Sequence, residues 1–337
     1  MSWFSVEDIG RVQIELTNYC NAACPQCDRY EQIQEWKDPD LNNSHFTLEQ
    51  IKNIFSPYDW KSLDIIHYCG NVDEPTVNPE MLDITDYLIH NTNKPVIHVA
   101  TNGGTRDIEF WTELGILSKH FGVKVTFGLD GLHDTNHIYR RNVRWDKVEK
   151  NYNAYIKAGG YAIWQFIVFD HNVHQLQAAK DLADKEGFKE FQIIQSGRAN
   201  VMNPTKENDV KKQEIDVPDW YDYNPLTIDG VDIKEVKLDC VRCPAKLNSK
   251  MTGFHQTEGN IYISAKGYVT PCCWMGNPRE LIKLWKTKNI DKKGHNVLNN
   301  HLQNILDGEW YSHIDNQMQE YDLCVSKCKE INGDKHL

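Results

Sequence analysis

Short hydrophobic runs alternate with amphipathic stretches over the first two hundred residues of the chain. Runs rich in β-branched and aromatic residues favour strands, and we predict them at 12–16, 63–68, 96–100, 123–127, 162–169 and 190–195. The stretches between them favour helices. Thr47 and Gln50 form a capping-box pattern that opens the first helix, and further helices are predicted at 79–91, 107–120, 144–158 and 173–186.

Repeated strand–helix units predict an α/β protein with a parallel sheet. Six units are too few for a closed eight-stranded barrel, so we expect a partial (β/α)6 TIM-like barrel over residues 1–198. The alternation of strand and helix patterns stops at residues 199–238, which we predict to be a linker or bridging region. Residues 239–337 are predicted to form a smaller Cys-rich α+β domain. A hairpin is expected there from 260–264 and 268–270, and helix from 297–320.

Charge and composition exclude several classes of protein. The chain has 337 residues, with 37 Lys and Arg against 48 Asp and Glu and a net charge of −11, which argues against a nucleic-acid partner. No apolar run approaches the roughly 20 residues of a membrane span, and the N-terminal sequence lacks secretory signal features. We therefore expect a cytoplasmic protein without a membrane partner. Its ten cysteines should stay reduced, which favours metal or cluster ligation over disulfides.

Three cysteines with the spacing C-x3-C-x2-C follow the first predicted strand directly: Cys20, Cys24 and Cys27. Three thiolates on one loop can hold three irons of a [4Fe–4S] cluster and leave the fourth iron open to a substrate or cofactor. Zinc is the alternative, but it normally takes four ligands, so a further side chain elsewhere would have to complete that site.

This motif, on the loop after the first strand of a βα series, resembles the signature of the radical S-adenosylmethionine (SAM) superfamily. The resemblance implies that the open iron chelates SAM. One electron, from a donor such as flavodoxin or ferredoxin, then cleaves SAM to methionine and a 5′-deoxyadenosyl radical that abstracts hydrogen from a substrate. Gln26 departs from the family pattern, because the position before the third cysteine is usually aromatic.

The same resemblance implies SAM contacts at the ends of later strands. Residues 69–75 resemble the family's Gly-Gly-Glu-Pro segment, with Val72-Asp73 in place of the two glycines. A plain βα turn is the alternative interpretation of that segment. An arginine after the fourth strand would suit the SAM carboxylate, whereas Gly128 stands where relatives often carry serine. The expected SAM-binding residues are Gly70, Asn71, Asp73, Glu74, Thr101, Asn102, Asp130 and Arg140. The sequence identifies no catalytic residue.

Six further cysteines lie in the last third of the chain, in an arrangement that resembles the auxiliary-cluster extensions called SPASM and twitch. Six thiolates cannot fully ligate two [4Fe–4S] clusters, so we expect one auxiliary cluster, with structural zinc as the alternative. The preferred ligands are Cys240, Cys272, Cys324 and Cys328, with Cys243 as the rival to Cys240. Cys273 should point away from Cys272 if both lie on a strand. We expect Cys69 to be a buried thiol rather than a ligand.

These features predict a radical SAM enzyme that oxidises or otherwise modifies a substrate with the help of an auxiliary cluster. A peptide or protein substrate is one possibility, although the first strand begins too near residue 1 for a preceding leader-peptide-binding module. A small alcohol or sugar is the second possibility. A non-enzymatic iron–sulfur or zinc-binding protein is an alternative from a different class.

Overall fold

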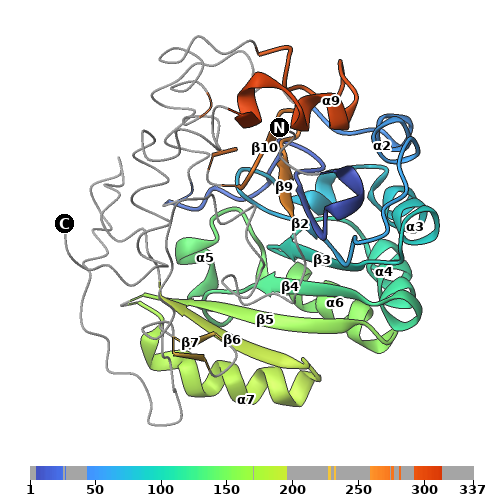
Figure 1. Cartoon of the computed structure of the whole chain (residues 1–337). Coiled ribbons are helices and arrows are strands. Elements are labelled where there is room, and N and C mark those ends of the chain that lie inside the picture. Colours follow the sequence, from blue (N-terminus) through green and yellow to red (C-terminus); the bar gives the residue numbers. More distant parts are fainter. Residues whose placement is uncertain are drawn as a thin grey trace, which may run out of the picture.

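The structure, a computed structural model, describes residues 5–25, 27, 44–169, 171–195, 227–228, 231–232, 259–273, 275–276, 281 and 292–312. Within these residues the six predicted strands are present, each within three residues of its expected ends. They are β1 (Arg11–Ile14), β2 (Ile65–Tyr68), β3 (Val96–Thr101), β4 (Val123–Gly128), β5 (Tyr161–Val168) and β6 (Glu190–Gln195). All five neighbouring pairs from β1 to β6 are parallel, as repeated βα units require (Figure 1).

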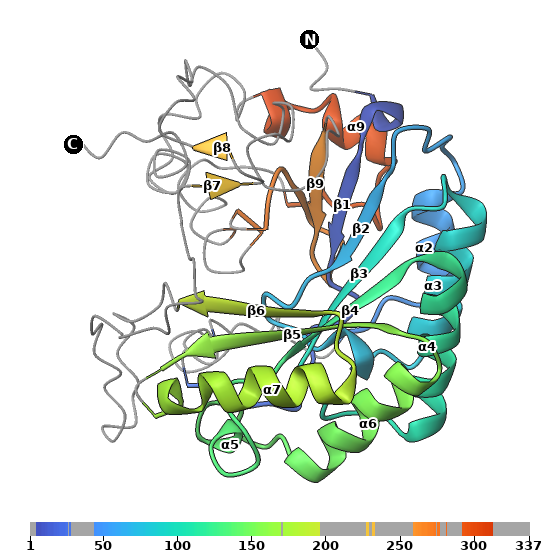
Figure 2. The same ribbon diagram turned by 90° about the horizontal axis from the view of Figure 1, so that it is seen from below.

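The predicted helices connect these strands and lie along one side of the curved sheet (Figure 2). They are α2 (Leu48–Phe55), α3 (Met81–Asn91), α4 (Ile108–Phe121), α6 (Trp145–Lys157) and α7 (Leu176–Glu186), with the short α5 (Asn136–Tyr139) after β4. The single-turn helix η3 (Pro75–Val77) follows β2. This arrangement is a partial TIM-like barrel, as the sequence predicted.

The two faces of the sheet differ in polarity, because successive strand side chains point in opposite directions. Residues aligned across β1 to β4 on one face are fully buried: Val12, Ile66, Ile97 and Val123. Tyr68 on this face bonds to Thr85 of α3, so this is the face under the helices. The next aligned row is polar and consists of Gln13, His67, His98 and Lys124. Parallel sheets are usually apolar on both faces, so this polar row distinguishes the inner face from the face under the helices.

The predicted C-terminal hairpin is present, but it extends the barrel sheet. β9 (Asn260–Ile263) pairs in parallel with β1, and β10 (Val269–Thr270) pairs antiparallel with β9. The strand order is therefore β10-β9-β1-β2-β3-β4-β5-β6, and Figure 2 shows β9 beside β1. The short strands β7 (Thr227–Ile228) and β8 (Val231–Asp232) pair with each other. The division into domains at 198 and 238 stays a prediction.

The helix predicted at 297–320 begins five residues later than expected, at Leu302. α9 (Leu302–Leu306) is followed by helical residues 309–312, and residues 313–320 lie outside the described part of the chain.

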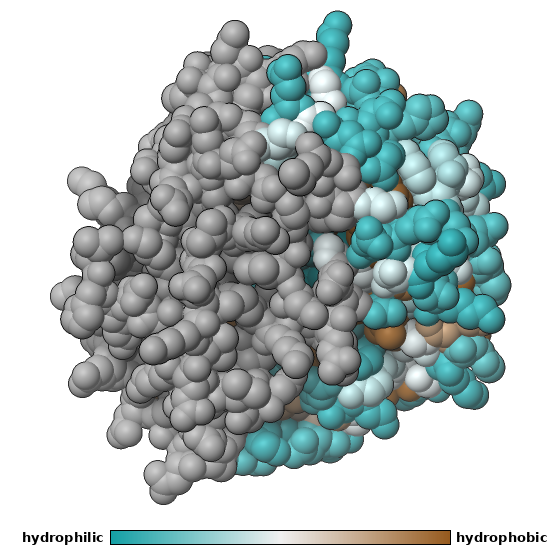
Figure 3. Space-filling model, in the orientation of Figure 1, coloured by the Kyte–Doolittle hydropathy of each residue, from teal (hydrophilic) through white to brown (hydrophobic). Residues whose placement is uncertain are grey.

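No helix among the described residues has both the length and the apolar character that a membrane span needs. On the face in Figure 3, the described surface is mostly hydrophilic, with scattered hydrophobic side chains.

Candidate functional site

The loop that follows β1 carries Cys20, Cys24 and Cys27, and backbone hydrogen bonds tie it to the barrel. Glu74 N donates to the carbonyl of Tyr19 (2.7 Å), and Ala23 N donates to the carbonyl of Arg141 (3.0 Å). Cys27 N donates to the carbonyl of Cys24 (3.1 Å), which turns the loop between the second and third cysteines. The loop is thus held at the carboxyl end of the sheet, where parallel sheets bind ligands.

The three cysteines are thiols that influence one another electrostatically. Burial raises the pKa of Cys24 to about 11, although the charge of Arg140 opposes the shift. Burial and the neighbouring Glu74 raise the pKa of Cys20. These groups therefore carry protons near neutral pH, and binding of iron would release them.

The chemistry of this donor set fits a [4Fe–4S] cluster, since three cysteines share one loop and each of the first two has an N–H donor near its sulfur. Asn102 Nδ2 lies 3.9 Å from Cys20 Sγ, and Arg140 Nη1 lies 3.9 Å from Cys24 Sγ. Among the described residues, no group of three or more His, Cys, Asp or Glu side chains has the arrangement of a site for a metal ion.

Glu74, which follows β2, is buried and uses its carboxylate entirely within the protein. Its Oε1 accepts from the hydroxyls of Thr76 and Thr101 (both 2.6 Å) and from Thr76 N (3.3 Å), while Oε2 accepts from Asn102 N (2.7 Å). Burial raises its pKa, and these donors oppose the shift. Its side chain thus fixes the loop that follows β3, and the expected contact of Glu74 with SAM stays a prediction.

Thr101 and Asn102, at the end of β3, bring that loop to the cysteine loop. The Asn102 amide donates to Asn21 Oδ1 (2.8 Å) as well as approaching Cys20. Asn102 Oδ1 in turn accepts from Gly104 N (2.8 Å). Of the two residues expected at a cofactor site, Asn102 lies next to the first cysteine and Thr101 bonds to Glu74; their contact with SAM stays a prediction.

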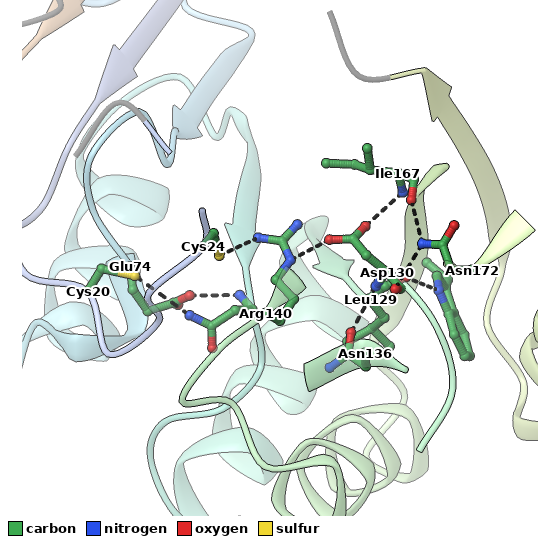
Figure 4. Close-up of polar contacts among 11 residues, drawn as sticks. Cys20, Cys24, Glu74, Leu129, Asp130, Asn136, Arg140, Ile167 and Asn172 are labelled. Carbon is green, nitrogen blue, oxygen red and sulfur yellow. Dashed lines mark hydrogen bonds and ion pairs between the residues drawn. The ribbon is translucent and has the colours of Figure 1, made fainter. Parts of the chain in front are cut away.

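Asp130 and Arg140 form an ion pair beside Cys24 (Figure 4). Arg140 Nε donates to Asp130 Oδ2 at 2.6 Å, and the Asp130 side chain has no exposure to solvent. Burial lowers the pKa of Arg140, but the charges of Asp130 and Cys24 raise it more, so the guanidinium stays charged. The sequence nominated both residues without predicting that they pair.

The other expected SAM contacts at the end of β2 differ in their surroundings. Gly70 is exposed, and Asp73 is 7% exposed. The Asn71 amide donates to the carbonyl of Cys273 (2.9 Å), so it connects the barrel to the C-terminal hairpin. Each of these three residues thus lies at the same end of the sheet as the cysteine loop.

Most of the expected auxiliary-cluster ligands lie outside the described residues: Cys240, Cys243, Cys324 and Cys328. Cys272 is described, half-buried and packed against the core. β10 ends at Thr270, so Cys272 and Cys273 follow the strand and the alternation of strand side chains does not apply to them. Cys273 lies near Cys272, Arg11 and Cys69, and burial raises its pKa to about 12.

Two asparagines at the site were not nominated as cofactor contacts by the sequence. Asn21, inside the cysteine motif, pairs with Asn102. Asn172 donates to the carbonyls of Asp130 (3.0 Å) and Ile167 (2.9 Å) and accepts from Phe169 N (2.7 Å). Its position after a predicted strand was the available signal, and its bond to Asp130 could not be predicted because the two residues are 42 positions apart in the chain.

Residues 14–182, just over half of the chain, match the profile of the Radical SAM superfamily. The chain belongs to this superfamily, and membership implies a [4Fe–4S] cluster and SAM as cofactors. No curated protein sequence matches the chain.

Solved structures share the fold. SuiB from Streptococcus suis bound to its precursor peptide SuiA has a TM-score of 0.60 at 13% identity, covering 92% of this chain and 67% of SuiB. SuiB bound to S-adenosylmethionine has a TM-score of 0.57 at 14% identity, covering 90% and 66%. The protein anSMEcpe with bound AdoMet has a TM-score of 0.52 at 12% identity, covering 89% and 77%. The chain thus spans about two thirds of the length of SuiB.

Proposed function

We propose that Cys20, Cys24 and Cys27 hold a [4Fe–4S] cluster through three thiolates and that SAM binds at the remaining iron. The observation that carries this proposal is the loop itself, which has three buried or half-buried cysteines and is tied by backbone hydrogen bonds to Glu74, after β2, and to Arg141, after β4. When bound, the cluster supplies the electron that cleaves SAM to methionine and a 5′-deoxyadenosyl radical. Flavodoxin or ferredoxin is the proposed electron donor.

The chain's own residues position these cofactors. Glu74 accepts from the Thr101 hydroxyl and from Asn102 N, and this places the Asn102 amide 3.9 Å from Cys20 Sγ. Asp130 holds the guanidinium of Arg140 beside Cys24 while leaving N–H groups for a carboxylate of SAM. Gly70, Asn71 and Asp73 are the proposed contacts for the SAM amino group.

We further propose that the substrate is a peptide or protein side chain, which is oxidised or otherwise modified with the help of an auxiliary [4Fe–4S] cluster in residues 239–337. The fold likeness to SuiB, solved with its precursor peptide, and to anSMEcpe, solved with the Cp18Cys peptide, supports this substrate class. The pattern of C-terminal cysteines, including Cys272, supports the auxiliary cluster.

Anaerobic reconstitution with iron, sulfide, SAM and dithionite tests the function. We expect about eight irons per chain, as two [4Fe–4S] clusters require, and release of 5′-deoxyadenosine. Cys20→Ala, Cys24→Ala and Cys27→Ala should each abolish that release. Cys69→Ala, which removes a buried thiol outside the trio, is the matched control and should retain it. Bound zinc without iron, or undiminished release from the trio variants, would contradict the proposed function.

A further inference from the structure

Arg140 is held on two sides. Its Nε donates to Asp130 Oδ2 at 2.6 Å, and its Nη1 lies 3.9 Å from Cys24 Sγ (Figure 4). Its guanidinium carbon also lies 5.4 Å from the centre of the Tyr139 ring. The arginine side chain is 18% exposed. A guanidinium with these neighbours has little freedom to swing away from the thiol.

The carboxylate that holds Arg140 is itself fixed by the backbone of β5. Asp130 Oδ1 accepts from Ile167 N at 2.7 Å, leaving Oδ2 for the arginine. The main chain of Asp130 is fixed as well, because its N–H donates to Asn136 Oδ1 (2.9 Å) and its carbonyl accepts from Asn172 Nδ2 (3.0 Å). Each polar group of Asp130 therefore has a defined partner, and the charge of Arg140 is set at one place relative to Cys24.

Gly128 provides the space that the guanidinium occupies. A Cβ atom added to residue 128 would lie 2.5 Å from Arg140 Nη2 and 3.1 Å from its Cζ, closer than van der Waals contact allows. Gly128 has no positive φ among the described backbone angles, so the glycine is required here by the neighbour and not by the backbone conformation. The position of the Arg140 guanidinium therefore depends on residue 128 having no side chain.

We propose that Gly128, Asp130 and Arg140 form a unit in which Arg140 is a positioning residue that places a fixed positive charge beside the Cys24 thiolate and thereby makes a cluster bound there easier to reduce. The inference rests on the proposed function. Reduction adds negative charge to a cluster, and a nearby cation stabilises the form with the extra electron. The effect is strong where water is largely excluded, as it is around Asp130 and Cys24.

The test is a potentiometric titration of the reconstituted protein followed by electron paramagnetic resonance. The signal that is absent from Cys24→Ala identifies the cluster at Cys20, Cys24 and Cys27, and the titration is done without SAM because Arg140 is a proposed SAM contact. For Arg140→Gln we expect the ratio of reduced to oxidised cluster at a fixed potential to fall about tenfold, a downward shift of about 59 mV for one electron. Arg140→Lys keeps the charge and should show a smaller fall.

Gly128→Ala tests the same unit without touching either charge, since the added methyl group must displace the guanidinium. It should reproduce the direction of the Arg140→Gln shift. Arg144→Gln removes an arginine whose side chain is 77% exposed and paired with Asp146, and it should leave the potential unchanged. Iron content is measured for every variant, so loss of the cluster is separated from a change in its potential.

Unchanged potentials in Arg140→Gln and Gly128→Ala, with iron content equal to the wild type, would overturn the inference while leaving the proposed function intact. Failure of the wild type to bind iron or to respond to SAM would instead remove the proposed function. If Arg140→Gln fails to fold, the comparison of Gly128→Ala with the wild type decides the question alone, because a lowered potential supports the inference and an equal one overturns it.

Discussion

Glu15 lies directly after β1 and is a carboxyl group with 1% exposure to solvent. Its Oε1 accepts a hydrogen bond from Val72 N at 3.0 Å. Tyr262 of β9 and Cys69 at the end of β2 are close enough to interact with it electrostatically. Burial raises the pKa of Glu15 from about 4.5 to about 7, and hydrogen bonding by Val72 N only partly opposes this shift. The folded protein therefore binds a proton at Glu15 more tightly than the unfolded chain does.

This difference predicts how Glu15 makes stability depend on pH. Its contribution is fully present below about pH 4.5 and is lost as pH rises through about 7, a change of about 3 kcal/mol. Glu15→Gln lacks the titrating group, so its free energy of unfolding should rise relative to the wild type between pH 5 and pH 8. Urea denaturation at both pH values measures this, with the exposed Glu49→Gln as the control. A wild-type–variant difference that is equal at both pH values would refute it.

At the scale of elements, the ends of helices and strands set the site. Helix α2 begins after Thr47, whose hydroxyl accepts from Gln50 N (3.2 Å), and Gln50 Oε1 accepts from Thr47 N (3.0 Å). Leu48 N donates to Glu80 Oε2 (2.8 Å), next to the start of α3. The capping box predicted from the sequence is confirmed, and it fixes where the chain turns from the segment after the cysteine loop into the barrel's helical layer.

Thr47→Ala should lower the free energy of unfolding by about 1 kcal/mol, since the N–H of Gln50 loses its acceptor. Thr47→Ser keeps the hydroxyl and should lie within about 0.5 kcal/mol of the wild type. Chemical denaturation followed by circular dichroism measures both variants. Equal losses in the alanine and serine variants would show that the hydroxyl is not what stabilises this helix start.

At the scale of the whole molecule, one sheet joins distant parts of the chain. Arg11 aligns with Asn260, and Val12 aligns with Ile261, where both side chains of the second pair are fully buried. Asn71 reinforces the junction through its hydrogen bond to the carbonyl of Cys273. The hairpin therefore covers the edge of β1 that would otherwise present unpaired backbone groups.

Ile261→Ala should lower the free energy of unfolding by about 2–5 kcal/mol, because it leaves a cavity in this junction. The junction is continuous with the barrel, so we expect tryptophan fluorescence and circular dichroism to follow one common, shifted transition. Ile116→Ala, at a side chain that is 48% exposed on α4, is the control and should have little effect. A second transition that leaves the barrel unshifted would show that the hairpin unfolds independently.

Much of the fold and part of the site could be predicted because their signals are local. Hydrophobic periodicity located β1 to β6 and the helices between them, and the spacing of Cys20, Cys24 and Cys27 indicated a three-thiolate site. The pairing of β9 with β1 could not be predicted, since the hairpin pattern carries no information about which edge it joins. The expected orientation of Cys273 assumed that it lies on a strand with Cys272, but β10 ends at Thr270, before both cysteines.

The sequence by itself determined the order of the elements, the cysteine loop at the end of the first strand, and the residues near the ends of later strands that gather there. Only the tertiary structure decided the partners of those residues. Glu74 turned out to bond to Thr101 and Asn102, and Arg140 to lie between Asp130 and Cys24. The physical reason is that a buried polar side chain bonds to whichever groups packing brings within about 3 Å, and those groups come from strands far apart in the chain.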